Sequence, residues 1–330
     1  MTDISKRSLL KAAAVAGAAL LIAQPVQAQE FPSRTITLVV PFAAGGVTDL
    51  TARIYANALS EQLGKPVVVD NKPGAGGTTG GALVADAAPD GYTLLWSGSS
   101  LVALAPLIYP DLAYDISTAY QPISRIMTHT LMLAVSTSIE PATVDEFVAY
   151  AKANPDSLNY GSPGIGTLHH FTGELLKAEY GIEMQHIPYQ GNGPAMTDLL
   201  AGNIQAMFIG TPLALQYDGD DKIRLLAVTS ASRDAGFPDL VTFTEQGHPA
   251  FEAAQSWYGV LAPAGLPPDV LEKLSEASKA AAQSESVVKT AAESGMTTVV
   301  EEPEDFATEI AGTSKAWADL VAAAGMTFDE

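Results

Sequence analysis

Short runs of β-branched and apolar residues alternate along the chain with longer amphipathic stretches. The short runs predict strands at residues 35–40, 67–70, 92–96, 131–135, 158–160, 184–189, 206–209 and 223–229. The longer stretches predict helices at residues 48–63, 78–87, 144–153, 167–180, 194–201, 268–282 and 303–324. Such alternation is typical of α/β proteins in which parallel strands are flanked by helices. No repeat of about 20 to 50 residues and no low-complexity linker divides the chain.

The first 28 residues follow a different pattern. Lys6, Arg7 and Lys11 precede an unbroken apolar stretch at 12–23, and a Val-Gln-Ala triplet ends at Ala28. This order predicts a secretory signal peptide cleaved after Ala28, since a membrane span needs about 20 apolar residues. The alternative, a buried helix of a cytoplasmic domain, would carry a polar face. Lys6 stands where a twin-arginine signal has its first arginine, so the export route stays open.

The composition favours a folded, exported protein that is not anchored in a membrane. Removal of residues 1–28 leaves 302 of 330 residues, enough for two domains, and 47% apolar against 16% charged residues argue against disorder. The chain contains no cysteine. It therefore has no disulfide and no cleavage-site cysteine for a lipid anchor. We expect a freely diffusing protein that works outside the cytoplasm.

The charge limits the possible partners. The net charge is −20, and removal of one Asp and three Lys or Arg with the signal peptide brings it to −22. This sign makes binding to nucleic acid or to an anionic membrane surface unfavourable. An anionic ligand would also be repelled at long range, so its attraction would have to come from local backbone dipoles and a few donors.

The first glycine-rich turn covers residues 41–49, between the strand at 35–40 and the helix at 48–63. Gly45 and Gly46 leave backbone N–H groups uncovered, and the helix N-terminus behind them carries about half a positive charge, which suits a carboxylate. Alternatively, Thr48 and Asp49 only cap the helix. The apolar face of this helix is expected at Leu50, Ile54, Ala58 and Leu63, with Gly64 as the C-terminal stop.

A second glycine-rich turn, residues 160–167, repeats the order of strand, turn and helix, and two such turns facing each other would hold both ends of a small diacid. A third stretch, residues 71–80, superficially matches a dinucleotide-binding fingerprint. It fails because Thr79 occupies the third glycine position and no acidic residue ends a strand about 20 residues later. We interpret it as a structural turn and predict no cofactor.

Enzymatic alternatives find little support. Ser162 lies on a strand-to-helix turn, but its surroundings are not a G-x-S-x-G elbow, and Pro163 removes the N–H that would serve an oxyanion hole. His169 and His170 are adjacent and would point about 100° apart on a helix, which is poor geometry for one metal ion. We expect His170 to be a packed or capping residue. The protein is therefore predicted to have no catalytic residue and no metal site, with a hydrolase acting through Ser162 as the alternative.

Several ordered motifs together resemble one family. They are residues 32–49, the stretch 71–77, Pro89-Asp90-Gly91-Tyr92-Thr93, His186-Ile187-Pro188-Tyr189, Leu225-Leu226-Ala227-Val228-Thr229, Pro238-Asp239-Leu240, Trp257-Tyr258-Gly259 and Ala262-Pro263-Ala264-Gly265. In this order they resemble the Bug family, the periplasmic solute-binding proteins of tripartite tricarboxylate transporters. The resemblance covers essentially the whole mature chain.

The resemblance implies a two-domain α/β fold of the periplasmic-binding-protein type (type II-like), with domain 1 at 29–129 plus 257–330 and domain 2 at 130–256. The chain would cross near 127–131 and 255–258. A small carboxylate would lie between the domains and pass to membrane transporter subunits, or, alternatively, signal to a membrane sensor kinase. The site that the resemblance implies consists of Phe42, Ala43, Gly45, Gly46, Thr48, Asp49, Ser162, Gly164, Gly166, Thr167 and His169, to which we add Ser97, Tyr189 and Thr211.

Two departures from the family pattern bear on the ligand. Gln190 stands where many relatives have lysine, and Ile209-Gly210-Thr211 lacks the acidic residue that many relatives have after this strand. The second change removes a partner for a ligand ammonium group. We therefore expect a di- or tricarboxylate or an aromatic acid rather than an acidic amino acid.

Overall fold

A computed structural model describes residues 30–109, 112, 114–155 and 157–328. The predicted signal peptide, residues 1–28, thus lies outside the described residues. The chain divides into an N-terminal segment that ends at Ser33 and a compact unit, Arg34–Glu330. All the elements below belong to this second unit. No helix within the described ranges combines the length and the apolar character that a membrane span needs.

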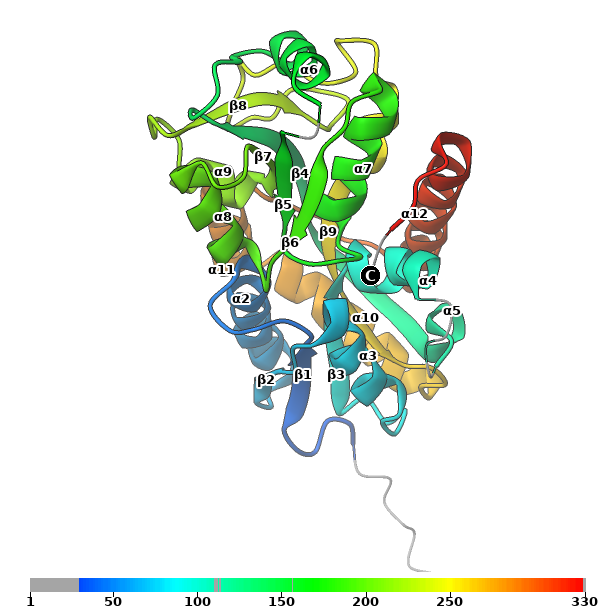
Figure 1. The fold of residues 1–330 in the computed structure, drawn as a ribbon. Coiled ribbons are helices and arrows are strands. Elements are labelled where there is room, and N and C mark those ends of the chain that lie inside the picture. The colour runs from blue at the N-terminus through cyan, green and yellow to red at the C-terminus, as the bar shows by residue number, and fades with distance from the viewer. Residues whose placement is uncertain (1–29, 110–111, 113, 156, 329–330) are drawn as a thin grey trace, which may run out of the picture. The chain divides into compact units, whose positions relative to one another are not determined.

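The strands and helices alternate as the sequence pattern predicts (Figure 1). The strands are β1 (Ile36–Val40), β2 (Val67–Asn71), β3 (Thr93–Gly98), β4 (Tyr120–Ser136), β5 (Asn159–Ser162), β6 (Gln185–Pro188), β7 (Ala206–Gly210), β8 (Ile223–Val228), β9 (Gln255–Pro263) and β10 (Thr297–Thr298). The helices are α2 (Val47–Leu63), α3 (Thr78–Ala85), α4 (Ala105–Ile108), α5 (Ile116–Ala119), α6 (Val144–Ala153), α7 (Leu168–Tyr180), α8 (Asn192–Ala201), α9 (Thr211–Gln216), α10 (Pro268–Ala282), α11 (Glu285–Glu293) and α12 (Pro303–Ala324). Three single turns are η1 (Ala75–Gly77), η2 (Ser100–Leu104) and η3 (Pro249–Ala253).

The described strands form one continuous sheet in the order β2-β1-β3-β9-β4-β7-β5-β6, and β8 and β10 also pair with β4. Strand β4 changes partners part-way along its length. Its residues from Tyr120 to Thr130 pair with β9, whereas those from Leu131 onward pair with β7 and β8. The long strand therefore links a first group of strands (β1, β2, β3, β9) to a second group (β5, β6, β7, β8).

Parallel pairing holds where the sequence shows strand–helix–strand units. Strand β1 is parallel to β2 and β3, and β5 is parallel to β6 and β7. The pairs that contain β4, and the pair of β3 with β9, are antiparallel. The sequence pattern did not reveal these pairs, because only residues 131–135 of β4 read as a strand and β9 was expected only as a crossover.

Local signals fix several helix ends. Thr143, the N-cap of α6, accepts a hydrogen bond from the Glu146 N–H, while the Glu146 carboxylate accepts one from the N–H of the preceding residue, Ala142, so reciprocal bonds similar to a capping box start α6. Helix α12 has Pro303 at its first position and ends at Gly325, whose φ of 61° is left-handed. The bounds of α6, α10 and α12 agree with the prediction because each has such an end signal or a strong apolar period.

The predicted apolar face of α2 is wrong in part. Leu50 is 53% exposed, whereas Ala52, Tyr55 and Leu59 are fully buried. Tyr55 contacts α10, where its hydroxyl donates to Ser278 Oγ at 2.7 Å. The helix is rotated about its axis relative to the prediction, so that Tyr55 faces the core and Leu50 faces solvent. Burial of the large tyrosine ring with a hydrogen-bond partner stabilises the fold more than burial of the leucine would. The expected stop at Gly64 is confirmed, with φ 64°.

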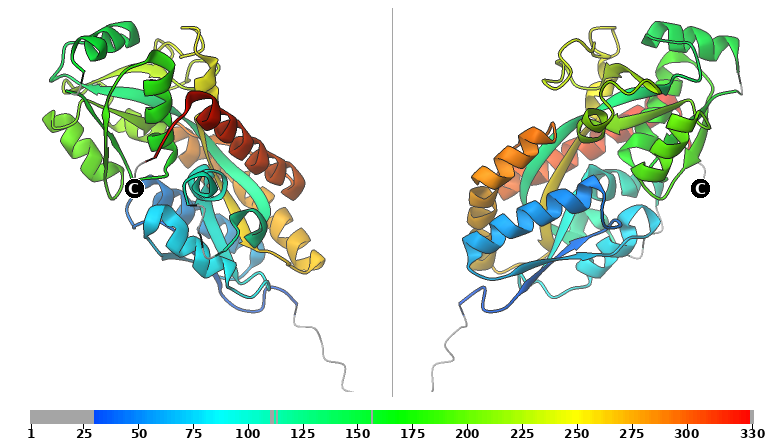
Figure 2. Two further views of the ribbon diagram at one scale, coloured as in Figure 1. Left: turned by 45° about the vertical axis from the view of Figure 1, so that its right-hand side comes forward. Right: turned by 90° about the vertical axis from the view of Figure 1, so that its left-hand side faces the viewer.

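Two buried clusters underlie the two groups of strands. One contains Leu95, Trp257 and Leu261, and the other contains Leu133, Phe171 and Phe208. Helix α12 contributes to both, through Phe306 in the first and Trp317 in the second, and Figure 2 shows this helix alongside the long strands. Helix α12 therefore packs against both predicted domains and not within one alone. The domain boundaries at 129/130 and 256/257 stay a prediction.

Candidate functional site

The first glycine-rich turn presents an open helix N-terminus. Gly46 is the N-cap of α2 and has an extended backbone, and no side chain caps the helix. The N–H groups of Val47, Thr48 and Asp49 have no hydrogen-bond partner among the described residues. Residues 43–46 are exposed. The turn thus offers several unused donors at the positive end of a 17-residue helix.

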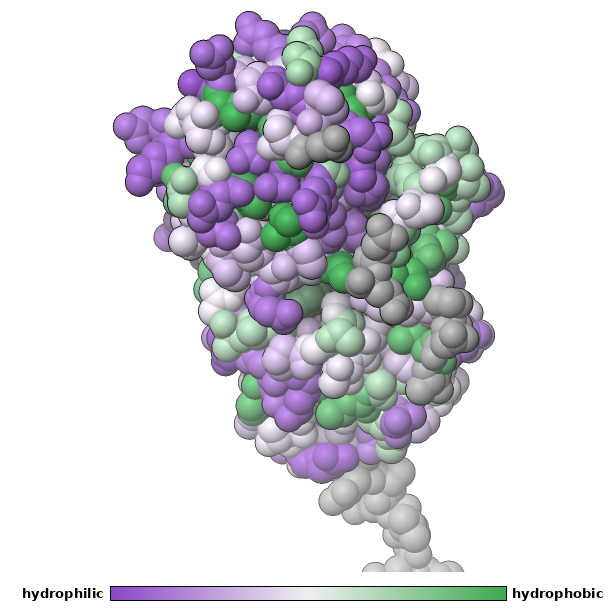
Figure 3. All heavy atoms as spheres, in the orientation of Figure 1, coloured by the Kyte–Doolittle hydropathy of each residue, from purple (hydrophilic) through white to green (hydrophobic). Residues whose placement is uncertain are grey.

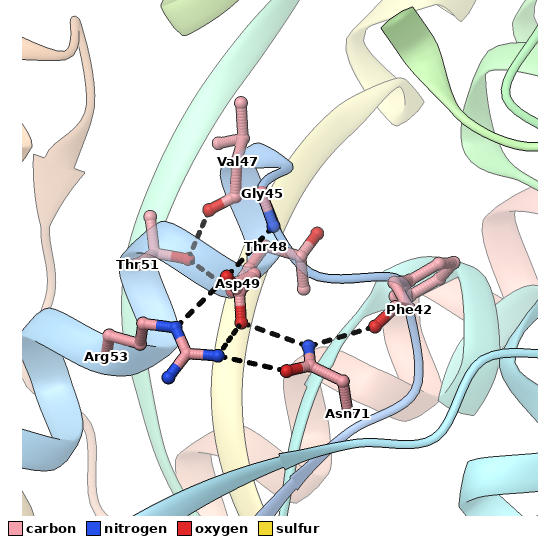
Figure 4. A network of polar contacts seen from close by, with 8 residues as sticks. All are labelled: Phe42, Gly45, Val47, Thr48, Asp49, Thr51, Arg53 and Asn71. Carbon is pink, nitrogen blue, oxygen red and sulfur yellow. Dashed lines mark hydrogen bonds and ion pairs between the residues drawn. The ribbon is translucent and has the colours of Figure 1, made fainter.

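Asp49 holds the turn from behind rather than facing a ligand (Figure 4). Its carboxylate accepts hydrogen bonds from the Gly45 N–H at 3.0 Å, from Arg53 Nε at 3.1 Å and from Asn71 Nδ2 at 3.0 Å. Asn71 Nδ2 also donates to the carbonyl of Phe42 at 3.0 Å. Burial pushes the pKa of Asp49 upward, but the hydrogen bonds from Arg53, Gly45 and Asn71 outweigh it, so this pKa lies below its usual value. The charges of Asp49 and Arg53 therefore neutralise each other.

The second glycine-rich turn is capped by the protein itself. Thr167 is the N-cap of α7, and its hydroxyl accepts from the His170 N–H and donates to the Gly164 carbonyl. Leu168 N–H donates to Ser100 Oγ of η2 at 3.1 Å. The N–H groups of Ile165 and His169 alone keep no partner in the described part of this turn. The two turns are thus not equivalent, because α7 offers fewer free donors than α2.

A buried serine and two histidines support the second turn. Ser162 Oγ lies 2.7 Å from His186 Nε2 and accepts from the Gly164 N–H at 3.2 Å. The His186 ring stacks on His170 at 3.8 Å, and His170 Nδ1 accepts from the Gly166 N–H. Burial lowers the pKa of His170 to about 3 and that of His186 to about 4. The expectation that His170 packs and caps is therefore confirmed.

The third glycine-rich stretch lies between the other two turns. A Cβ on Gly76 would lie 3.1 Å from the Ile165 carbonyl oxygen, and one on Gly77 would lie 3.5 Å from the Phe42 ring. Gly76 and Gly77 have φ values of 61° and 101°, which favour glycine. The stretch is a structural turn, as predicted, and it also brings the first and second turns close together.

A tyrosine and two further histidines lie next to the open end of α2. Thr48 Oγ1 donates to the Tyr258 hydroxyl at 3.2 Å, and the Tyr258 ring lies 5.8 Å from the ring of His129 on β4. Burial lowers the pKa of His129 to about 4. Burial, followed by the neighbouring His129, lowers that of His169 to about 3. Both rings are therefore neutral at pH 7.

Thr211 has an acidic neighbour that the strand sequence does not reveal. Its hydroxyl donates to Asp234 Oδ2 at 2.9 Å, and Thr130 Oγ1 donates to the same oxygen at 2.9 Å. Asp234 Oδ1 accepts from the Gly236 N–H. Residues 209–211 therefore do not exclude a ligand with an ammonium group, since the loop after β8 supplies a carboxylate there.

Comparison with known proteins identifies the family of the chain. The sequence profile described as "Tripartite tricarboxylate transporter family receptor" matches residues 51–326. Protein BugT of Bordetella pertussis is 36% identical over 305 residues, which cover 92% of this chain and 93% of BugT. The chain belongs to this receptor family. The resemblance to Bug proteins is thereby confirmed.

Solved structures of related proteins have the same fold as this chain. An R. palustris protein with adipate has a TM-score of 0.84 and 32% identity, covering 90% of this chain and 99% of its own. MatC from Rhodopseudomonas palustris with bound malate has a TM-score of 0.82 and 30% identity, covering 88% of this chain and 100% of its own. The structure of periplasmic binding protein BugD has a TM-score of 0.82 and 34% identity, covering 89% of this chain and 99% of its own, so the predicted two-domain periplasmic-binding-protein fold is confirmed.

The remaining predicted site residues lie at the ends of strands. Ser97, fully buried at the end of β3, donates to the Gly98 carbonyl at 3.1 Å. The Tyr189 hydroxyl donates to Asp198 at 2.7 Å, while the Tyr189 carbonyl lies 3.5 Å from the Cβ position of Gly164. Both hydroxyls are thus already engaged within the receptor, and ligand contact by any residue of the predicted set stays a prediction.

The sequence pattern did not single out His129, Tyr258 or Asp234. Tyr258 belongs to the Trp-Tyr-Gly motif that supported the family resemblance and lies within the predicted crossover at 255–258, which was an available signal. His129 also fell within the predicted crossover at 127–131. Asp234 left no signal, because residues 229–242 form irregular structure that no periodicity describes.

The described residues line two cavities, of which the second reaches the first glycine-rich turn at Val47. One of about 450 Å³ lies between η3 and α12 and is lined by Gln255, Thr308 and Glu309, among others. The other, of about 240 Å³, lies beside α2 and is lined by residues that include Val47 and Met127. Figure 3 shows a further indentation near the middle of its face, below the end of β6 in that view. We place the candidate site at the glycine-rich turns because their unused N–H donors suit an anion. The volumes of the two cavities do not enter this choice.

Replacement of Asp49 is expected to loosen the first turn. Asp49→Ala leaves the Gly45 N–H without its acceptor, removes one of the two acceptors of the Asn71 amide and leaves Arg53 without a carboxylate partner, so it should lower the free energy of unfolding by about 2 to 4 kcal/mol. Urea denaturation would measure this. Asp70→Ala, which removes an exposed ion pair with Lys72 at 3.1 Å, is the matched control and should cost less than about 1 kcal/mol. Equal losses would show that Asp49 is not the support of the turn.

Proposed function

We propose that this receptor binds a small carboxylate, either a di- or tricarboxylate or an aromatic acid, and delivers it to the membrane subunits of a tripartite tricarboxylate transporter. The uncapped N-terminus of α2 is the observation that carries the proposal. Relatives solved with adipate and malate support the ligand class. We place the receptor in the periplasm, after export and cleavage behind Ala28, as a monomer that is not anchored in the membrane.

In this proposal one carboxylate end accepts hydrogen bonds from the free N–H groups at the start of α2, those of Val47 to Asp49. The α2 dipole adds to these bonds, and charge-assisted hydrogen bonds are worth about 1.5 to 3 kcal/mol each. The second end lies toward the N–H groups of Ile165 and His169. Arg53, the basic residue that follows the first turn, is already paired with Asp49. In this proposal no cationic side chain of the first or second turn therefore contacts the ligand. The two predicted domains, 29–129 plus 257–330 and 130–256, would each supply one turn.

A hydrolytic function has less support. The pairing of Ser162 with His186 at 2.7 Å resembles a nucleophile with its base. Ser162 is fully buried, however, and its oxygen also binds both polar backbone groups of Gly164. The pair therefore holds the turn in place, and we propose that the receptor performs no chemistry.

A thermal-shift screen of mono-, di- and tricarboxylates tests the binding function. A ligand at 100 times its dissociation constant adds about 2.7 kcal/mol of stability, which corresponds to a rise of several degrees in melting temperature. The protein should be refolded from denaturant first, so that a ligand retained during purification cannot mask the shift. If no carboxylate raises the melting temperature, the receptor function is contradicted.

Transport and sensing predict the same ligand and differ in the membrane partner. A pull-down with detergent-solubilised transporter subunits, with and without the best ligand from the screen, separates the two. Capture of the transporter subunits supports transport, whereas capture of a sensor kinase alone contradicts it.

A further inference from the structure

The chain turns back after α12 and reaches the helix that follows the second glycine-rich turn. Gly325 adopts a left-handed backbone with φ 61°, and the Met326 N–H donates to the Val321 carbonyl at 3.1 Å, as in a Schellman motif. This reversal brings Phe328 onto α7, where its ring lies 4.3 Å from that of Phe171 (Figure 1). The last described residue of the chain therefore packs at the start of α7.

Phe328 also contacts His170 in the first turn of α7. The two rings meet edge to face, with their centroids 5.2 Å apart and their planes at 86°. The ring of His186 stacks on His170 at 3.8 Å, with the planes at 10°. Edge-to-face and stacked arrangements are both favourable for aromatic rings. The imidazole of His170 is thus restrained by two neighbouring rings, one of which comes from the end of the chain.

The restrained ring holds one side of the second glycine-rich turn. His170 Nδ1 accepts from the Gly166 N–H at 3.3 Å. On the other side of the turn, Ser162 Oγ binds both polar backbone groups of Gly164. Between the two glycines lies Ile165, whose N–H has no partner in the described part of this turn and is one of the donors proposed for the second carboxylate end. The direction of this N–H therefore depends on how firmly both glycines are held.

These contacts connect the end of the chain to a ligand donor. Resting on the proposed carboxylate function, we propose that Phe328 is a positioning residue for ligand binding. It restrains the ring of His170, which in turn holds the Gly166 N–H, so that the neighbouring Ile165 N–H keeps one orientation. Donors held in advance bind more tightly, because the free energy of ordering the turn is not subtracted from the binding free energy. A side chain that only filled the apolar cluster would stabilise the fold and leave the turn unchanged.

Amide hydrogen exchange, measured by NMR without ligand, tests the effect on the turn. In Phe328→Ala the Gly166 N–H should exchange about ten times faster than in wild type, because its acceptor ring loses a restraint. The Gly45 N–H, which donates to Asp49 in the first turn, should keep its rate. Phe328→Tyr retains the ring and should exchange as wild type does. Equal rates at Gly166 in wild type and Phe328→Ala would overturn the proposal. Equal acceleration at both glycines would also overturn it, because that result indicates a general loss of stability.

Calorimetry tests the effect on binding, with malate, adipate or the acid that stabilises wild type most in the thermal-shift screen. Phe328→Ala should weaken binding about tenfold, or about 1.4 kcal/mol, which is the order of the entropic cost of fixing one residue. Leu320→Ala, which removes another partly buried side chain of α12 from the same cluster, is the matched control and should bind as wild type does. Wild-type affinity in Phe328→Ala would overturn the positioning role. If wild type binds no acid, the receptor function is contradicted, and the exchange rates at Gly166 still decide whether Phe328 holds the turn.

A double-mutant cycle shows whether Phe328 acts through His170. His170→Gln removes the ring that Phe328 contacts. If the effect runs through this ring, the double variant Phe328→Ala/His170→Gln should bind no more weakly than His170→Gln alone. Losses of affinity that simply add would mean that Phe328 influences binding by another route, and they would overturn the proposal.

Discussion

Gly46→Val is expected to abolish carboxylate binding while leaving the fold in place. The φ of Gly46 is −85°, which any residue adopts, and an added Cβ would meet nothing within 4 Å. A valine would therefore cover the donors at the start of α2 without a clash. The loss of two charge-assisted hydrogen bonds at about 1.5 to 3 kcal/mol each should weaken binding by about 100-fold or more, as calorimetry would measure. The melting temperature without ligand should change little, because Gly46 provides no side-chain cap.

Two control variants sharpen this experiment. Gly193→Val places the same side chain in equally open space at the start of α8 and should not affect the affinity. Lys72→Ala removes the nearest basic side chain of the third glycine-rich stretch, which is paired with Asp70, and should change the affinity less than about tenfold. Gly45 and Gly164 are less suitable positions, because their φ values of 89° and 146° would strain a valine. Loss of binding in Lys72→Ala together with full binding in Gly46→Val would show that a side-chain cation holds the ligand.

The protein without ligand is expected to lose stability steeply between pH 6.5 and pH 4. Four histidines have folded-state pKa values of about 3 to 4, below the ordinary value of 6.5, because burial disfavours their charged form. In this pH window the unfolded chain binds protons that the folded chain does not, so the free energy of unfolding falls as the pH falls. Each histidine contributes about 1.4 kcal/mol per pH unit, or about 2 kcal/mol by pH 5.

Urea denaturation at half-unit steps from pH 7 to pH 5 would measure the slope. Carboxylates titrate mainly below this range, so the histidines dominate it. His170→Gln removes one of the four groups and should make the slope about a quarter shallower, even though it also loses the stack on His186. Identical slopes for wild type and variant would mean that His170 is not held neutral in the fold.

The sequence predicted the elements whose period and end signals are local. Helix α6 has its reciprocal bonds at the N-terminus, and α10 and α12 start at prolines, so their bounds agree with the prediction. The sequence did not predict the full length of the antiparallel strands β4 and β9, because these strands are stabilised by pairing with strands that are distant in the chain. The orientation of α2 was misjudged for a similar reason, since the contact between Tyr55 and Ser278 joins residues 223 positions apart.

For the site, the sequence located the turns but not their difference. Both turns have the same order of strand, glycines and helix, and only the structure shows that Ser100 and Thr167 occupy the donors of α7 while those of α2 stay free. Ser100 lies 68 residues from its partner. The unpartnered Nε2 of His129 was equally hidden, because a free ring nitrogen is a property of what surrounds the side chain and not of the sequence beside it.

Helix α12 ties the two groups of strands together. Phe306 packs edge-on against Trp257 at 5.1 Å, and Trp317 packs edge-on against Phe171 at 5.3 Å while its indole donates to the Ala253 carbonyl. The two aromatic residues are eleven positions apart on one helix, which corresponds to about 16 Å. The helix thus sets a fixed spacing between the two buried clusters. If the two groups of strands moved relative to each other by more than side-chain adjustment allows, one of these two aromatic contacts would have to break.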